Sequence, residues 1–242
     1  LIDFNNHMKR LDRSMTELKF KKLLNHLDIL IFHRKLIELN NLKEGMIYLQ
    51  VTRGVADRSF DMPKDKIEPT VLAFTQEKKI IDSESAKNGI KVMTLDDMRW
   101  KRCDIKTTQL LYASMAKTEA TEKGFDDAWM LREGYVTEGS SSNAWIIKGK
   151  IIMTRQSDNL ILSGITRDAI FKCAKDLGYE VVTKNITLPD AQSASEAFIT
   201  SATACVMPVV KINASQIGDG KPGKFVTALR EEYIKQALES SI

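Results

Sequence analysis

A single carboxylate, Glu138, stands in a short polar stretch between two apolar runs. Residues 134–143 read Gly-Tyr-Val-Thr-Glu-Gly-Ser-Ser-Ser-Asn, and the flanking residues 127–132 and 144–148 have the composition of buried strands. We expect this stretch to be a loop that holds one fixed acceptor beside several donors. Such a loop suits an oriented polar ligand with an anionic end. For this stretch alone, a polar hairpin turn is the alternative.

Lys106 ends the sequence Cys103-Asp-Ile-Lys, directly before a segment that predicts a helix over 107–123. The apolar stripe of this helix includes Leu110, Leu111 and Met115. A helix start disfavours a cation, and desolvation adds to that effect, so both lower the pKa of an amine and favour a nucleophilic or Schiff-base lysine. A surface lysine whose stem lies along apolar groups is the alternative.

Two junctions have the composition of an anion site. Gly164-Ile165-Thr166 opens a predicted helix and offers backbone N–H groups and a hydroxyl. Ordinary capping by Ser163 or Thr166 is the alternative. The predicted strand at 197–200 runs into the polar segment Ser201-Ala202-Thr203, which can face the same anion.

Other motifs are weaker. The three histidines, His7, His26 and His33, lack the spacing of a metal site, so no metal is expected. Residues 218–223 match G-x-G-x-x-G, but too little chain follows for a dinucleotide-binding unit, and a turn before the last helix is sufficient. The serines at 140–142 lack the strand-to-helix elbow of a serine nucleophile.

The elements that must position these residues mix helices and strands. Helices are predicted at about 5–18, 20–40, 107–123, 164–178 and from 224 onward. Strands are predicted at 46–53, 70–75, 89–95, 127–132, 144–148, 180–183, 197–200 and 206–212. The charged stretch 76–88 lacks periodicity, which places a domain boundary there and predicts domains at 1–80 and 81–242.

Length and composition limit the class of protein. The 242 residues suffice for two modest domains, and 43% hydrophobic and 28% charged residues are typical of globular proteins. A net charge of +4 that is spread along the chain does not predict nucleic-acid binding. Three cysteines without C-x-x-C spacing predict a reducing compartment, the cytoplasm. No apolar run approaches the ~18 residues of a membrane span. The chain opens at Leu1 without a signal-like start, which predicts a fragment.

Six stretches in order along the chain resemble the class IV (fold-type IV) aminotransferases that use pyridoxal 5′-phosphate, particularly their D-amino acid branch. They are residues 6–11, 50–54, 99–106, 136–143, 162–167 and 218–223. The resemblance implies an α/β protein of α+β type with two domains that works as a homodimer. The small N-terminal domain would lack its first strands here, and the larger C-terminal domain would carry a barrel-like sheet.

By this resemblance, Lys106 would bind the cofactor as a Schiff base and then carry the proton between substrate and cofactor. Glu138 would pair with the pyridine nitrogen and keep it protonated. The remaining cofactor contacts would come from Arg10, Ile165, Thr166, Ser201 and Ala202 at the phosphate and from Leu162 on the ring face.

On the substrate side the resemblance implies Arg58, Phe60 and Ser141. The family carries Arg-x-His in this loop, and here Phe60 replaces the histidine. An apolar ring cannot donate a hydrogen bond to a carboxylate, so substrate preference and D-selectivity remain open at this point.

The implied reaction moves an amino group from an amino acid, with D-amino acids such as D-alanine favoured, to a 2-oxo acid. A branched-chain aminotransferase and a 4-amino-4-deoxychorismate lyase are the alternatives within the family. A non-catalytic small-ligand-binding protein is the alternative of another class, and the intact pair of Lys106 and Glu138 argues against it.

Overall fold

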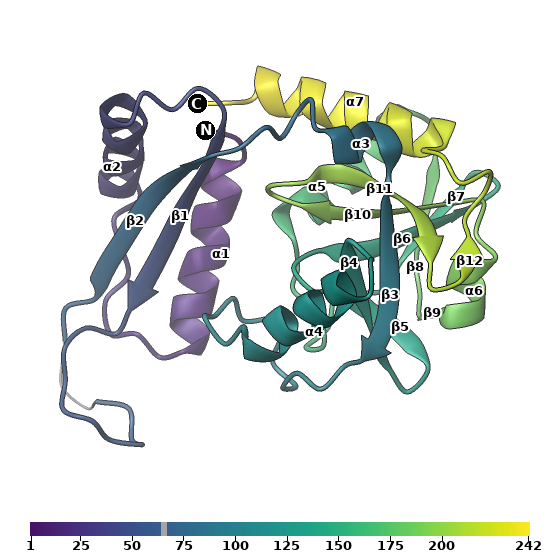
Figure 1. The fold of residues 1–242 in the computed structure, drawn as a ribbon. Coiled ribbons are helices and arrows are strands. Elements are labelled where there is room, and N and C mark those ends of the chain that lie inside the picture. The colour runs from purple at the N-terminus through teal and green to yellow at the C-terminus, as the bar shows by residue number, and fades with distance from the viewer. Residues whose placement is uncertain (64–66) are drawn as a thin grey trace. The chain divides into compact units, whose positions relative to one another are not determined.

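The computed structural model describes residues 1–63 and 67–242, which form two compact units. One unit comprises Phe4–Ile80, and the other comprises Leu1–Asp3 together with Ile81–Ile242. Both units mix helices with strands, which confirms the predicted α/β class (Figure 1).

The smaller unit carries an antiparallel hairpin and two flanking helices among its described residues. Its elements are α1 (Phe4–Glu17), α2 (His26–Leu39), β1 (Gly45–Thr52) and β2 (Thr70–Glu77). The hairpin is in register from the pair Gly45–Glu77 to the pair Thr52–Thr70. Tyr48 and Phe74 stack across it with ring centroids 5.0 Å apart.

The predicted helix over 20–40 is wrong at its start, because α2 begins at His26. Lys19 has a φ of +58°, which is incompatible with a continuing right-handed helix and ends α1. Asn25 then caps α2, since its side chain accepts a hydrogen bond from the Leu27 N–H at 2.9 Å. Leu23 consequently lies in the connection between the helices.

The larger unit is built on one mixed sheet that curls into a half-barrel. Its strands follow the order β8-β7-β6-β10-β11-β3-β4-β5-β9, with β12 paired to β11. They are β3 (Ile90–Asp96), β4 (Asp127–Arg132), β5 (Tyr135–Gly139), β6 (Asn143–Lys148), β7 (Ile151–Thr154), β8 (Glu180–Thr183), β9 (Ile186–Thr187), β10 (Glu196–Ser201), β11 (Cys205–Ile212) and β12 (Ser215–Gln216). The helices of this unit are α3 (Glu84–Asn88), α4 (Leu111–Glu122), α5 (Ile165–Asp176), α6 (Leu188–Gln192) and α7 (Lys224–Glu239).

The central strands are buried on both faces, which explains their continuous apolar sequences. In β6, residues 143–147 are all buried, and α5 and α7 contact the neighbouring β10. Trp145 stacks on Phe198 with ring centroids 5.3 Å apart, and its indole N–H donates to the Thr200 hydroxyl at 2.9 Å. These contacts hold β6 and β10 in one register at the end of the sheet that carries the candidate site.

The stretch 134–143, predicted as a loop, is largely a strand. Residues 135–139 form β5, which pairs with β4 and β9, and the turn is confined to residues 140–142. Val136 and Ile186 are register partners and both are buried, so hydrophobic pairing outweighs the polar composition. The prediction also lacks five short elements of the larger unit: β7, β9, β12, α3 and α6.

The predicted helix over 107–123 also begins later, at Leu111. The Thr107 hydroxyl accepts from the Gln109 N–H at 3.3 Å, a local turn that competes with helix formation. Lys106 therefore lies well outside the first helical turn. Because a helix dipole acts within about one turn, the expected dipole effect on the pKa of Lys106 is not supported.

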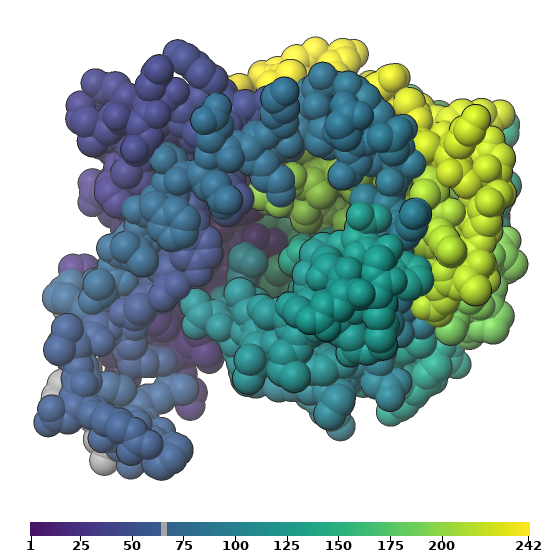
Figure 2. All heavy atoms as spheres, viewed as in Figure 1, coloured from purple at the N-terminus to yellow at the C-terminus, as the bar shows by residue number. Residues whose placement is uncertain are grey.

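The predicted apolar stripe of this helix is also wrong. Leu110, Leu111 and Met115 are exposed, and the helix packs through the buried residues Ala116 and Ala120. Figure 2 shows α4 in teal on the surface of the larger unit. The C-terminal end of α4 agrees with the prediction, since Gly124 has a φ of +78°, which ends a right-handed helix.

Candidate active site

Glu138 is a buried carboxylate in β5 that is held from three sides. Two side chains donate hydrogen bonds to it: Arg99 through Nη1 to Oε1 at 2.5 Å, and Asn143 through Nδ2 to Oε2 at 3.0 Å. The backbone N–H of Leu162 donates to the two carboxylate oxygens at 3.2 and 3.1 Å. With 4% exposure and donors from three segments, the carboxylate has one fixed orientation.

Burial dominates the protonation of this carboxylate. It raises the pKa of Glu138 to about 7, although the charge and hydrogen bond of Arg99 act in the opposite direction. A carboxylate poised near neutrality can exchange a proton with a bound base at physiological pH.

Arg99 belongs to a charged cluster that is not among the predicted site residues. Asp97 binds Arg99 through both carboxylate oxygens, at 2.9 and 2.8 Å, and accepts a hydrogen bond from the Thr137 hydroxyl at 2.8 Å. Arg132 donates to the main-chain oxygens of Asp97 and Arg99 at 3.1 and 2.8 Å. Because this cluster joins residues up to forty positions apart, sequence spacing gives no sign of it, although Arg99 lies within a stretch that matches the family.

Leu162 and the start of α5 lie next to Glu138 through shared hydrogen bonds. Asn143 donates to the Leu162 carbonyl at 2.8 Å as well as to Glu138. The N-cap of α5 is Gly164, which provides no side-chain cap, so the predicted alternative of capping by Ser163 or Thr166 does not occur. The helix start, with Ile165 and Thr166 buried, is therefore not closed by a capping side chain.

Ser201 and Ala202 lie at the same end of the sheet as Glu138. They follow Thr200, whose register partner in β6 is Asn143. The Ser201 hydroxyl accepts from the Ala204 N–H at 3.2 Å, which shapes the turn, and Ala202 is exposed. The structure thus brings this turn, the start of α5 and Glu138 to the same end of the half-barrel.

Lys106 is exposed at the end of a segment that is bound to the loop before α5. The Cys103 N–H donates to the Asn159 carbonyl at 2.9 Å, and the Asn159 amide donates to the Lys101 carbonyl at 2.8 Å. Arg99 also donates to the Leu160 carbonyl at 3.3 Å. Lys106 and Leu162 therefore belong to segments that are joined by main-chain contacts. Ser141 is exposed in the turn between β5 and β6.

The remaining predicted residues lie in the smaller unit. Arg10 is half-buried on α1, with Nη2 3.5 Å from Nδ1 of His7. Arg58 and Phe60 lie in the connection after β1, where the Arg58 guanidinium is 5.3 Å from the Phe60 ring centroid. The assignment of these three residues to the same site as Glu138 remains a prediction.

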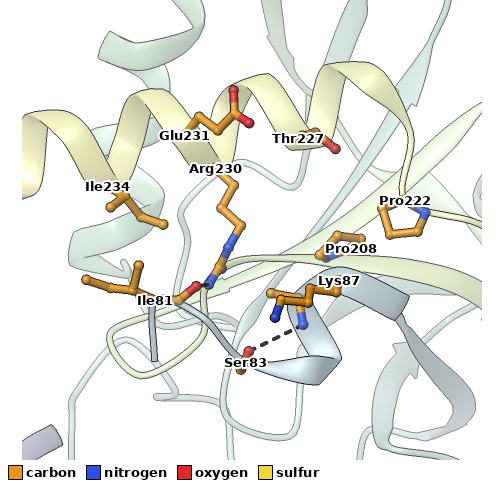
Figure 3. A pocket seen from close by; sticks show the side chains of 10 residues that line it. Ile81, Ser83, Lys87, Pro208, Pro222, Thr227, Arg230, Glu231 and Ile234 are labelled. Atoms are coloured by element: carbon orange, nitrogen blue, oxygen red, sulfur yellow. Dashed lines mark hydrogen bonds between the residues drawn. The ribbon is translucent and has the colours of Figure 1, made fainter. Parts of the chain in front are cut away.

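A groove of about 440 Å³ lies elsewhere on the larger unit, among α3, β11 and α7. No predicted site residue lines it. Figure 3 shows Arg230 reaching from α7 toward Ile81, whose carbonyl accepts a hydrogen bond at 2.9 Å. Arg230 also binds the carbonyls of Ala204 and Val206 at 2.8 and 2.7 Å. Its role visible here is to anchor the turn that carries Ser201 and Ala202.

We expect Gly164→Ala to destabilise the larger unit by about 1–3 kcal/mol. A Cβ at Gly164 would collide with Oδ1 of Asn143, which must then give up its hydrogen bonds to Glu138 and Leu162. Urea unfolding measures the change, with the neighbouring Ser163→Ala as a control expected to stay within about 0.5 kcal/mol of wild type. Equal stability of both variants would show that the site accommodates the methyl group.

The fold and the site together define a fold-type IV aminotransferase. The model of the family described as amino-transferase class IV matches residues 1–212. The chain belongs to this family and is an enzyme, which confirms the resemblance drawn from its sequence.

Curated relatives and solved structures agree with this assignment. D-alanine aminotransferase of Staphylococcus aureus (strain MSSA476) is 36% identical over 244 residues, which cover 100% of this chain and 86% of the relative. The same enzyme of Bacillus licheniformis is 36% identical, with 100% and 83% covered. The Escherichia coli branched-chain amino acid aminotransferase superposes with a TM-score of 0.88 at 23% identity, covering 98% of this chain and 80% of that one. The T.th. branched-chain amino acid aminotransferase with pyridoxamine 5′-phosphate superposes with a TM-score of 0.87 at 26% sequence identity, covering 99% of this chain and 80% of that one.

Proposed function

We propose that the larger unit binds pyridoxal 5′-phosphate at the edge of the half-barrel marked by Glu138, and that the enzyme transfers amino groups between an amino acid and a 2-oxo acid. The observation that carries the proposal is the fixed, buried carboxylate of Glu138, hydrogen-bonded to the loop that leads into an uncapped helix start. A pyridine nitrogen and a phosphate are the two polar ends that such an edge would accept.

The residues present fit this cofactor. Gly164 offers no capping side chain at the N-terminus of α5. The absence of a Cβ there allows the close approach of Asn143, whose side-chain nitrogen donates to Glu138. The backbone N–H groups of Ile165 and Thr166 would bind the phosphate, together with the turn at Ser201 and Ala202. Arg10 would supply the charge that neutralises it.

When bound, the cofactor supplies an electron sink for the negative charge that develops at the substrate Cα. Glu138 would hold a proton on the ring nitrogen, and its fixed orientation removes the cost of reorganisation during the reaction. Lys106 would bind the cofactor covalently and, once free, would move the proton at the substrate Cα. Leu162 would pack against the ring face, with its main chain already bound to Glu138 and Asn143.

Similarity to D-alanine aminotransferases over the whole chain supports D-amino acids such as D-alanine as donors. Arg58 would bind the substrate carboxylate and Ser141 would line the same side. Phe60 cannot donate a hydrogen bond, so we expect a broader acceptance of apolar side chains than a histidine would allow. Branched-chain substrates are the second candidate, favoured by this apolar residue and by the similarity to branched-chain aminotransferase structures. Half-reactions with D-alanine, L-leucine and L-valine, followed by the cofactor spectrum, distinguish the two.

We further propose a cytoplasmic homodimer in which Phe4–Ile80 is the small domain and the larger unit binds the cofactor. Phe60 and Val55 are 96% and 89% exposed in the loop after β1, and a second subunit that covers this loop would bury both. Among the described residues, no helix has the length and apolar character needed to cross a membrane.

Borohydride reduction of the loaded enzyme, followed by peptide mapping, tests the proposal. We expect the reduced adduct on Lys106. An adduct on Lys101 or Lys117 would overturn the assignment of Lys106, and failure to trap any adduct would contradict covalent binding of the cofactor.

We expect Arg10→Ala to weaken cofactor affinity by roughly 10- to 100-fold, because a charge-assisted hydrogen bond contributes about 1.5–3 kcal/mol. Equilibrium dialysis of the loaded enzyme measures the change. Lys9→Ala, an exposed cation on the same helix, is the matched control and is expected to retain the cofactor. Equal retention by both variants would place the phosphate away from Arg10.

A further inference from the structure

We propose that Asp97 is a positioning residue that sets how strongly Glu138 holds a proton, because it orients Arg99 toward Glu138 and opposes the charge of Arg99. Its consequence for amino transfer rests on the proposed function of Glu138. The coupling between the two carboxylates is independent of that proposed function, since it is a property of this chain alone.

The geometry of Arg99 supports the first part of the proposal. Asp97, whose side chain has no exposed surface, binds Nε and Nη2 of Arg99 at 2.9 and 2.8 Å. A two-point contact of this kind fixes the plane of the guanidinium group. The remaining nitrogen, Nη1, is thereby left 2.5 Å from Glu138. Asp97 thus determines where the donor to Glu138 stands.

The distribution of charge supports the second part. One partly buried guanidinium lies between two buried carboxylates, so both carboxylates compete for its stabilisation. Burial raises the pKa of Asp97, but the hydrogen bonds and charge of Arg99 outweigh this effect and leave that pKa below its usual value. The pKa of Glu138, by contrast, remains raised by burial, and the charge of Asp97 adds to the increase. With burial and Arg99 acting on both carboxylates, the ionised form is favoured at Asp97 and the protonated form at Glu138.

Neighbouring groups modify this balance. Arg132 lies with Nη2 3.4 Å from Oδ1 of Asp97, and Thr137 donates to Oδ2. Other ionisable groups that interact with the cluster are Cys103 on the same segment, Tyr112 on α4 and Arg167 on α5. Cys103 and Tyr112 are neutral at physiological pH, because burial raises the pKa of both. Of the groups named here, Asp97 supplies the negative charge that opposes Arg99 at Glu138, whereas Arg132 and Arg167 are cations.

This opposition matters for the proposed chemistry. A carboxylate that faces an uncompensated guanidinium becomes a weaker base. Glu138 would then accept a weaker hydrogen bond from a protonated ring nitrogen of the cofactor. With Asp97 in place, Glu138 keeps both its fixed orientation and its basicity.

The test measures the titration of Glu138 by ¹³C NMR in the full chain without cofactor, with labelled glutamate and the resonance assigned by its loss in Glu138→Gln. We expect Asp97→Asn to lower the midpoint by about one pH unit or more, because the amide oxygen still accepts from Arg99 while the negative charge is removed. Asp96→Asn, the same chemical change at the exposed preceding residue, is expected to leave it unmoved. An unchanged midpoint in a folded Asp97→Asn protein would overturn the proposal.

Arg132→Gln provides a second test that applies if Asp97→Asn does not fold. It removes the cation beside Asp97, so the midpoint of Glu138 is expected to rise by roughly half a pH unit; no rise would equally overturn the coupling. In the loaded enzyme, the pH at which the cofactor spectrum changes should move in the same direction as the NMR midpoint. If the midpoint moves and the spectrum does not, the coupling holds and the proposed role of Glu138 at the cofactor fails.

Discussion

Replacing Lys106 by alanine is expected to abolish covalent binding of the cofactor and to slow amino transfer by roughly 10²–10⁴-fold or more, the contribution typical of a positioned acid–base group. The exposed position of Lys106 means that its loss should leave folding intact. Steady-state kcat with D-alanine and a 2-oxo acid, measured beside a melting curve, separates chemistry from stability.

The matched control is Lys101→Ala, which removes an exposed lysine from the same segment and should leave kcat within about twofold of wild type. Added methylamine should restore part of the rate in Lys106→Ala, because a free amine can carry the missing proton. Unimpaired turnover in Lys106→Ala would remove this residue from the mechanism.

The second large effect is expected from Glu138→Gln. The amide keeps the shape of the side chain but cannot hold a proton on the ring nitrogen as a carboxylate does. We expect proton transfer in single-turnover experiments to slow by at least ~10²-fold, since one preorganised electrostatic partner contributes about 2.7–4 kcal/mol. Glu133→Gln, in the exposed turn before β5, is the control and should react normally. A polar strand residue without a chemical role would show the opposite pattern, reduced stability with intact turnover.

The same variant should change how stability depends on pH in the protein without cofactor. Burial raises the pKa of Glu138 from 4.5 to about 7, so the folded state holds a proton that the unfolded state has released between these values. Its contribution to stability is therefore fully present below about pH 4.5 and is lost as pH rises through about 7. Melting temperatures of wild type relative to Glu138→Gln should fall across this range. A constant difference would show that Glu138 titrates normally.

The sequence predicts those parts of the site that lie within continuous segments. The helix start at Ile165 and the strand that leads to Ser201 follow from hydrophobic periodicity and local turn chemistry, and both appear close to their predicted positions. The strand containing Glu138 is mispredicted as a loop, because its stability comes from pairing with β4 and β9, which local composition does not reveal.

The charged cluster around Arg99 could not be predicted for a related reason. Asp97 and Arg99 follow β3, whereas Glu138 lies in β5, and β4 separates these strands in the sheet. Only the order of strands shows that the three side chains meet. Likewise, hydrophobic periodicity does not reveal the local turn before α4, in which the Thr107 hydroxyl accepts from the Gln109 N–H.

The main chain of Leu162 is bound at the candidate site in both directions. Its N–H donates to Glu138, and its carbonyl accepts from Asn143 at 2.8 Å. Because both peptide groups are bound whatever side chain is attached, exchange of this leucine for another apolar residue would leave the backbone of the site in place. The surface offered to the cofactor ring at this position can therefore vary over evolutionary time without loss of the scaffold, and it is a suitable first position for altering the reactivity of the enzyme by design.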